Sequence, residues 1–199
     1  MKHRVFISYH HAKDQFYKDK LAKFGKEHDI FIDGSVNTGD ISDELSDESI
    51  RVKIRDEYLR DTTVTILLVG KETKYRKHID WEIYSSMYDG RINKKSGIIV
   101  IYLPSVEGHI RSGHGTKEKN TVFPEIESWI SVNSREKHKD RHPYLPERIL
   151  DNLMSNSHIS IINWNDLTVG KLRDLIQYAY EDREEAEYDL TRPMRRRND

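Results

Sequence analysis

The run Val64-Thr-Ile-Leu-Leu-Val69 is almost continuously apolar and rich in β-branched residues, as is typical of a strand buried on both faces of a parallel sheet. A similar run, Gly97-Ile-Ile-Val-Ile-Tyr-Leu103, predicts a second buried strand that stops at Pro104. Between them, the segment from about 78 to 89 is predicted to be a helix that ends at Gly90. A strand, a helix and a second buried strand in succession indicate an α/β protein with a parallel sheet.

The same alternation extends toward the N-terminus. The run Arg4-Val-Phe-Ile-Ser-Tyr9 predicts a first strand, because it is rich in β-branched and aromatic residues. A charged segment with apolar residues at rough helical spacing follows, which predicts a helix that ends near Gly25. Ile30-Phe-Ile32 predicts a short second strand, and residues 34–48 predict a long polar loop. Apolar residues then recur every four positions, as on one face of a helix: Ile50, Ile54 and Tyr58.

The C-terminal half predicts a less regular arrangement. Residues 104–147 are rich in glycine, histidine, proline and charge, and they predict an insertion over the surface with one short helix near Pro124–Trp129. The elements expected after it are a helix, a fifth strand and a last helix: Leu145–Met154, Ile159–Ile162 and Val169–Tyr180. The tail, residues 183–199, alternates acidic and basic side chains and is expected to be solvated and flexible.

The elements together predict one domain over residues 1–182. Its centre is a parallel five-stranded sheet with helices on both faces, and the insertion 104–147 follows the fourth strand. The chain has 199 residues, which is enough for one domain with a hydrophobic core.

The composition argues against several classes of function. The chain has no cysteine, which excludes a disulfide framework, a thiolate metal site and a cysteine nucleophile. Its formal net charge of −1 creates no overall attraction to nucleic acid or membrane, so neither is expected as a partner. The sequence has no apolar window long enough for a membrane span and no signal-peptide pattern, so a cytoplasmic location is expected.

Familiar nucleotide and metal motifs are absent from the sequence. No G-x-G-x-x-G follows the first strand, and Gly70-Lys71 lacks the upstream glycine of a phosphate-binding loop. His138 and His142 are four residues apart and could share a helical face, but the charged stretch around them offers no obvious third ligand. We therefore expect no metal site and no bound cofactor.

The candidate site residues follow the predicted strands at their carboxyl ends, where open α/β sheets bind ligands. Ser8, Tyr9 and His10 follow the first strand, and Asp33 follows the second. Glu82 lies one turn into the helix after the third strand, from which it could overhang the same crevice. Taken alone, a helical glutamate is usually a solvated charge.

Several of these residues carry a resemblance to a known family. Arg4-Val-Phe-Ile-Ser-Tyr9 resembles the opening strand of TIR and TIR-like domains, and Thr65–Thr73 followed by Asp80-Trp-Glu-Ile83 looks like their third strand and third helix. The Trp-Glu-Ile stretch before an apolar strand is similar to the TIR-like proteins of the bacterial Thoeris anti-phage system. The resemblance covers residues 3–103, and residues 145–180 by element order alone. It implies a flavodoxin-like TIR fold.

The resemblance implies that Glu82 is catalytic, because a glutamate in this helix is the essential residue of catalytic TIR domains. Such a carboxylate would hydrogen-bond the ribose hydroxyls of NAD+ and stabilise the positive charge that develops as the nicotinamide bond breaks. The resemblance also implies substrate-binding roles for Phe6, Ser8, Tyr9, His10, Asp33, His78 and Trp81. His78 stands where the family often has a tryptophan, and packing is the alternative role for Trp81.

The function implied by the resemblance is that of a signalling enzyme. It would cleave NAD+, its substrate, to nicotinamide and a cyclic ADP-ribose-type messenger that activates a separate effector protein. Activity in this family often depends on assembly, so a homo-oligomer is compatible with the resemblance. Two alternatives stay open: a non-catalytic interaction module of the TIR type, and an enzyme that processes another nucleoside or nucleotide on the related flavodoxin-like layout.

Overall fold

The structure, a computed structural model, describes residues 2–35, 41–42, 44–91, 93–106, 108, 111–155 and 157–198. Among these residues, five strands form one parallel sheet in the order β2-β1-β3-β4-β5. The strands are β1 (Arg4–Ser8), β2 (Ile32–Asp33), β3 (Val64–Val69), β4 (Gly97–Tyr102) and β5 (Ile159–Asn163). This is the flavodoxin-like strand order, and the predicted fold class is confirmed.

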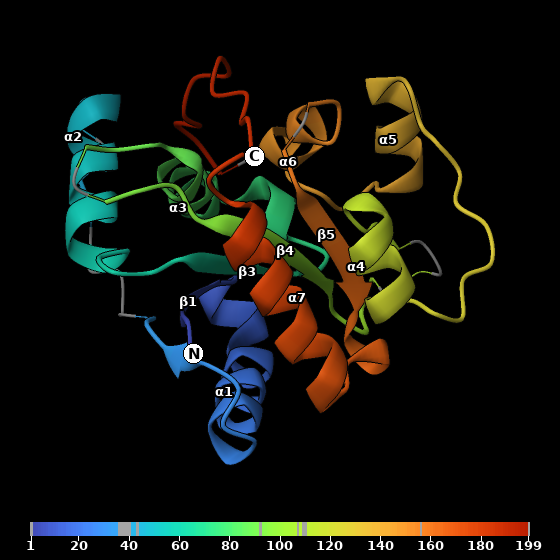
Figure 1. Ribbon diagram of the computed structural model, residues 1–199. Helices are drawn as coiled ribbons and strands as arrows, with labels where there is room; N and C mark the ends of the chain where they lie inside the picture. The colour runs from blue at the N-terminus through green and yellow to red at the C-terminus, as the bar shows by residue number, and fades with distance from the viewer. Residues whose placement is uncertain are drawn as a thin grey trace.

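Helices cover both faces of the sheet (Figure 1). One face carries α1 (His11–Glu27) and α7 (Val169–Asp182). The other face carries α3 (Lys77–Met87), α6 (Glu147–Asn152) and α2 (Asp47–Lys53), which continues into a π-helical turn, η1 (Ile54–Tyr58). Short 3-10 turns follow β3 and β5, namely η2 (Thr73–Tyr75) and η3 (Trp164–Asp166).

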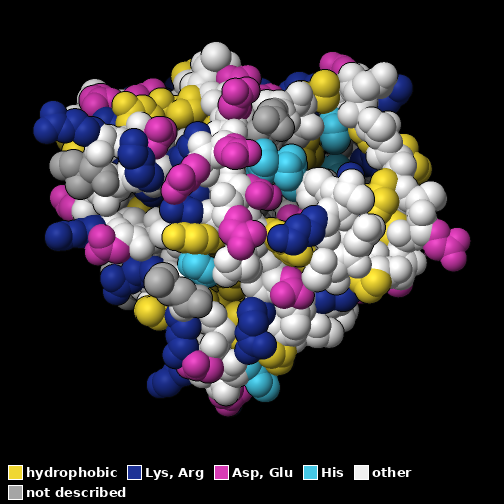
Figure 2. Space-filling view, viewed as in Figure 1, with side chains coloured by type: hydrophobic (Ala, Val, Ile, Leu, Met, Phe, Trp, Pro, Cys, Tyr) yellow, Lys and Arg dark blue, Asp and Glu magenta, His cyan; other side chains and the backbone are white. Residues whose placement is uncertain are grey.

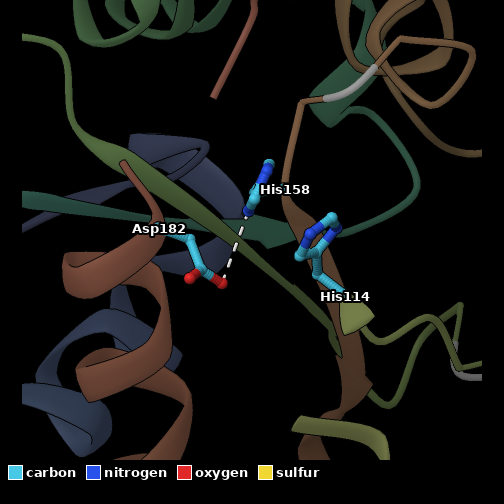
Figure 3. A group of neighbouring side chains, drawn as sticks. All are labelled: His114, His158 and Asp182. Carbon is cyan, nitrogen blue, oxygen red and sulfur yellow. Dashed lines mark ion pairs between the residues drawn. The ribbon is translucent and has the colours of Figure 1, made fainter. Parts of the chain in front are cut away.

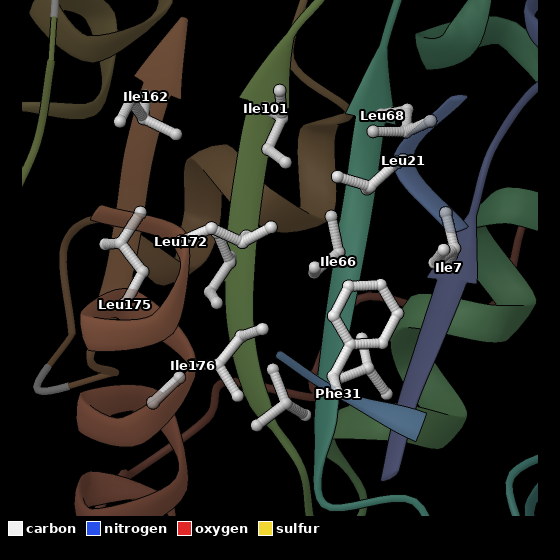
Figure 4. Close-up of a cluster of buried hydrophobic side chains, with 14 of the residues drawn as sticks. Ile7, Leu21, Phe31, Ile66, Leu68, Ile101, Ile162, Leu172, Leu175 and Ile176 are labelled. Carbon is white, nitrogen blue, oxygen red and sulfur yellow. The ribbon is translucent and has the colours of Figure 1, made fainter. Parts of the chain in front are cut away.

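The core explains why β3 reads as a continuous apolar run. Its alternate residues point to opposite faces, and both faces are covered by helices. Ile66 and Leu68 pack toward α1 and α7, whereas Leu67 and Val69 pack toward α3 and α6. Figure 4 shows the first of these clusters, in which leucine and isoleucine side chains of α7 lie against β4 and β5.

The insertion after β4 differs from its prediction. The short helix predicted near Pro124–Trp129 is wrong, because the helices of this region are α4 (Gly115–Val122) and α5 (Arg135–Arg141). Phe123 is buried in the core, and the rings of Phe123 and Trp129 meet edge to face with centroids 5.6 Å apart. Residues 124–129 form a turn and an irregular segment, from which Ile126 and Trp129 pack, partly buried, against the core.

The C-terminal tail also differs from its prediction. Its described part packs on the body of the protein above α3 and α6 (Figure 1). Met194 is buried beside Trp81, and the indole Nε1–H of Trp81 donates a hydrogen bond to the Arg195 carbonyl at 2.7 Å. The tail is anchored because it supplies buried apolar side chains and backbone acceptors. The alternating charges of residues 183–199 give no sign of these buried side chains or of these backbone acceptors.

The surface carries mixed charge. Figure 2 shows basic and acidic side chains interspersed on one face of the molecule, in line with the net charge of −1. Among the described residues, none of the helices has the length and apolar character needed to cross a bilayer.

Candidate active site

The site lies where the strand order reverses, between β1 and β3. In doubly wound sheets, ligands bind beyond the carboxyl ends of the strands at this point. Ser8 ends β1 and pairs in register with Leu67 of β3. The chain then passes from β3 to α3, which runs back along the sheet. The hydroxyl of Thr65 donates a hydrogen bond of 2.8 Å to Ser86 and so ties the second half of α3 to β3.

Ser8 and Glu82 form a buried pair at this point. The Ser8 hydroxyl donates a hydrogen bond of 2.7 Å to Oε2 of Glu82. Ser8 is 0 % exposed and Glu82 is 2 % exposed. The pairing follows from the alternation of β1, because Phe6 and Ser8 point to the face that α3 covers. Two residues that the sequence assigned to the site are therefore in direct contact.

Burial controls the charge of Glu82. Loss of hydration raises its pKa to about 7, and the hydrogen bond from Ser8 opposes this rise. The carboxyl group is therefore present in both protonation states at neutral pH. A carboxylate in such surroundings acts strongly on a nearby positive charge, since little water screens it.

Trp81 and His78 lie on another side of α3. Trp81 is fully buried in an apolar cluster with Phe6 and Met194. His78 is exposed, and its ring centroid is 4.9 Å from that of Trp81. These contacts give Trp81 a packing role, while the Glu82 carboxyl group points to β1.

Tyr9 and His10 continue the chain beyond Ser8 and turn away from it. The Tyr9 hydroxyl donates to Oε1 of Gln15 at 2.6 Å, and burial raises the pKa of Tyr9. His10 accepts a hydrogen bond of 2.7 Å at Nε2 from Nε of Arg76, the residue directly before α3. Burial and the nearby Arg76 charge lower the pKa of His10, which favours the neutral ring.

Asp14 and Arg76 are charged residues near this edge that sequence reasoning missed. Asp14 lies in the first turn of α1 beside Gly70, where a Cβ atom would come within 2.9 Å of its carboxylate oxygens. Burial, with a smaller contribution from Glu72, raises the pKa of Asp14 to about 6. Their positions at the starts of the helices after β1 and β3 are the signal that could have identified them.

Asp33 is separate from the Ser8–Glu82 pair. It is exposed at the end of β2, where its carboxylate accepts hydrogen bonds from Nζ of Lys18 at 3.1 Å and from the Ser35 backbone N–H at 2.9 Å. The hydroxyl of Ser35 accepts a hydrogen bond from the Ile7 N–H at 3.0 Å. Of the polar loop predicted over 34–48, residues 36–40 and 43 lie outside the described residues.

A cavity of about 250 Å³ adjoins the start of α3. Basic side chains contribute much of its wall: Lys74, Arg76, Arg192 and Arg195. Asp80 also lines it, but the Asp80 carboxylate is neutralised by two hydrogen bonds from the buried Arg148 guanidinium, at 2.8 and 2.9 Å. Glu147 lines the cavity too, and its carboxylate pairs with Arg135 and Lys139. Basic side chains therefore outnumber acidic ones in the lining of this cavity, next to the carboxyl edge of the sheet.

The fold and the site define the class of protein: a doubly wound, TIR-like α/β domain with a buried carboxyl group at the β1/β3 switch point. The family model of the Thoeris protein ThsB, TIR-like domain, matches residues 6–108, slightly more than half of the chain. The chain belongs to this family of TIR-type anti-phage proteins, and the resemblance seen in the sequence is confirmed. No curated protein and no solved structure matches the chain.

The matched region runs from β1 past the end of β4. It therefore includes Ser8 and Glu82. The helices of the insertion, β5, α7 and the C-terminal tail lie outside it.

Proposed function

We propose that this protein cleaves the bond between nicotinamide and ribose in NAD+, with Glu82 as the catalytic residue. The observation that carries the proposal is the buried hydrogen bond between Ser8 and Glu82 at the switch point of the sheet. Membership of the TIR-like family supports it, since catalytic TIR domains have their essential glutamate in this helix.

The proposed step is a heterolytic cleavage. The bonding electron pair moves to the pyridinium nitrogen, neutral nicotinamide leaves, and the ribose becomes an oxocarbenium ion. The ionised Glu82 carboxylate stabilises this cation, while the Ser8 hydroxyl holds the carboxylate in place. The nicotinamide ring is already positively charged, so it needs no general acid to leave.

The second step decides the product. Attack by water, which loses a proton, gives ADP-ribose. Attack by a nucleophilic atom of the same molecule gives a cyclic ADP-ribose-type messenger, and this outcome requires water to be excluded. We propose the cyclic product, which would reach and activate a separate effector protein as a diffusible signal in the cytoplasm.

The substrate would approach along the carboxyl edge of the sheet. The basic side chains of Lys74 and Arg76 in the cavity at the start of α3 suit the pyrophosphate of NAD+. Because Glu82 is only 2 % exposed, the ribose reaches it only after neighbouring groups move. We propose that assembly into a homo-oligomer produces this movement.

The test is nicotinamide release from NAD+, measured by chromatography on assembled protein. Wild type should release nicotinamide, and Glu82→Gln should reduce the rate by at least about 100-fold. Glu118→Gln is the matched control, because Glu118 is also buried, has a pKa raised to about 7 and accepts a hydrogen bond from Ser160 at 2.6 Å. Release that persists in Glu82→Gln would refute the assignment of Glu82.

A non-catalytic interaction module is the second candidate. The burial of Glu82 favours it, because a buried serine–glutamate pair can serve to hold α3 on β1. On this account, assembled wild type releases no nicotinamide, and Glu82→Gln assembles as wild type does.

A further inference from the structure

Three metal-ligating side chains meet at the edge of the sheet, far from Glu82 in the fold. His114 directly precedes α4, His158 directly precedes β5, and Asp182 is the last residue of α7. One ligand atom from each lies within 4.8 Å of the other two, and Figure 3 shows the side chains together. All three lie beyond residues 6–108, the part of the chain that matches the TIR-like family.

The backbone of His158 has a positive φ directly before β5. Its φ of 52° is in the left-handed region, which is uncommon for residues other than glycine, although Asn, Asp and His adopt it more often than most. Its Nδ1 atom is buried and makes no hydrogen bond within the described part of the chain. That atom faces Oδ2 of Asp182 at 3.4 Å, which is long for a hydrogen bond. The two groups form an ion pair when the imidazole is protonated, as the dashed line in Figure 3 marks; beside a neutral imidazole, a cation between them would give both atoms a partner.

His114 completes the group. Its ring centroid lies 3.4 Å from that of His158, with 28° between the ring planes. The backbone N–H of His114 donates to Oε1 of Glu118 at 3.1 Å, and this bond fixes the start of α4.

We propose that His114, His158 and Asp182 bind one divalent transition-metal ion of the zinc class. Two imidazole nitrogens and one carboxylate oxygen are suitable zinc ligands, whereas magnesium and calcium prefer oxygen alone. Zinc ligands lie about 2.0–2.2 Å from the ion, so the two stacked imidazole rings would turn apart on binding until one nitrogen of each points at the ion. The ion would fasten the insertion and β5 to the end of α7, and its fourth position is open to water.

A second histidine pair, His138 and His142, has no third ligand among the described residues, unlike the cluster of His114, His158 and Asp182. His138 and His142 have ring centroids 6.4 Å apart, and Nδ1 of His142 is already hydrogen-bonded to the Tyr102 hydroxyl at 2.9 Å. Within the ranges that the structure describes, this pair belongs to no group of three ligands. His138 and His142 are neighbours because they lie four residues apart at the end of α5. The fold, in contrast, brings His114, His158 and Asp182 together from three separate segments.

The test is zinc binding to untagged protein that has been stripped with a chelator. Calorimetric titration of wild type with Zn²⁺ should give one ion per chain. At free Zn²⁺ about 100-fold above Kd, Tm should rise by roughly 5–10 °C. Asp182→Asn and His158→Asn should each weaken binding by about 100-fold or more, since lesser changes around a site already cost 10–100-fold. Asparagine suits position 158 because it tolerates a positive φ. His28→Asn, an exposed histidine elsewhere, should bind as wild type does.

The proposal fails if stripped wild type takes up no stoichiometric zinc, or if both variants bind it as tightly as wild type. Should the variants not fold, X-ray absorption of zinc-loaded wild type decides instead. Two imidazole ligands in the spectrum support the site, and fewer than two overturn it.

Discussion

Replacing Glu82 by glutamine should stabilise the protein at high pH. Glutamine is close in shape to the protonated acid and still offers an oxygen to the Ser8 hydroxyl. The pKa of Glu82 is raised from 4.5 to about 7 in the fold, so the folded state holds this proton more tightly than the unfolded state does. Each tenfold difference in proton affinity is worth about 1.4 kcal/mol, so ionising buried Glu82 costs about 3 kcal/mol.

The sign of the pH dependence follows from linkage. The wild type loses this stability as pH rises from about 4.5 to about 7, whereas Glu82→Gln does not. The two proteins should be similar at pH 4, and the variant should be more stable by about 3 kcal/mol at pH 8. That difference corresponds to a Tm higher by roughly 6–12 °C for a chain of this size.

Thermal and urea unfolding of both proteins between pH 4 and pH 8 would measure the difference. Other acids with raised pKa values, such as Asp14 and Glu118, are present in both chains and cancel. Equal stability at pH 8, or a less stable variant there, would show that the folded protein accommodates the ionised carboxylate at no cost. The electrostatic account of the site would then be wrong.

Three further outcomes are expected. Ser8→Ala should lower the rate of nicotinamide release about 10–100-fold, because the hydrogen bond to the charged Glu82 carboxylate is lost. Ser85→Ala is the control and should leave the rate unchanged, since the buried Ser85 hydroxyl has no partner in the described part of the chain. In wild type, kcat/KM for NAD+ should rise with pH near a pKa of about 7, as Glu82 ionises. Ser8→Ala should move this rise to higher pH, because the Ser8 hydrogen bond lowers the pKa of Glu82. A pH-independent kcat/KM would argue against a catalytic carboxylate. Arg148→Ala should lower the free energy of unfolding in urea by about 3–5 kcal/mol, because it leaves the buried Asp80 carboxylate without its guanidinium partner. A decrease below about 1 kcal/mol would contradict the ion pair between Arg148 and Asp80.

The sheet was predictable because its central strands are buried on both faces. β3 and β4 leave continuous apolar runs, which are local signals. The position of Ser8 and Glu82 at one edge of the sheet was also predictable from the order of elements. Their hydrogen bond was not, because it joins residues 74 apart and depends on the register of β1 with β3.

The docking of the tail and the cluster of metal-ligating side chains could not be predicted from the sequence pattern, because both depend on contacts between distant segments. The tail docks in part through backbone carbonyls, such as those of Arg192, Pro193 and Arg195, and a carbonyl is the same in every residue. His114, His158 and Asp182 come from three separate segments, so no spacing along the chain could group them. In the insertion, a short helix was expected near Pro124–Trp129, but this stretch is a turn and an irregular segment whose Trp129 ring meets that of Phe123 edge to face.

The central claim is that Glu82 breaks the nicotinamide–ribose bond of NAD+. Mass spectrometry of the small molecules formed from NAD+ by assembled wild type and Glu82→Gln tests it most directly. The account predicts nicotinamide together with a cyclic ADP-ribose isomer from wild type, and unchanged NAD+ from the variant. Unchanged NAD+ in both samples, or the same products from both, would contradict it.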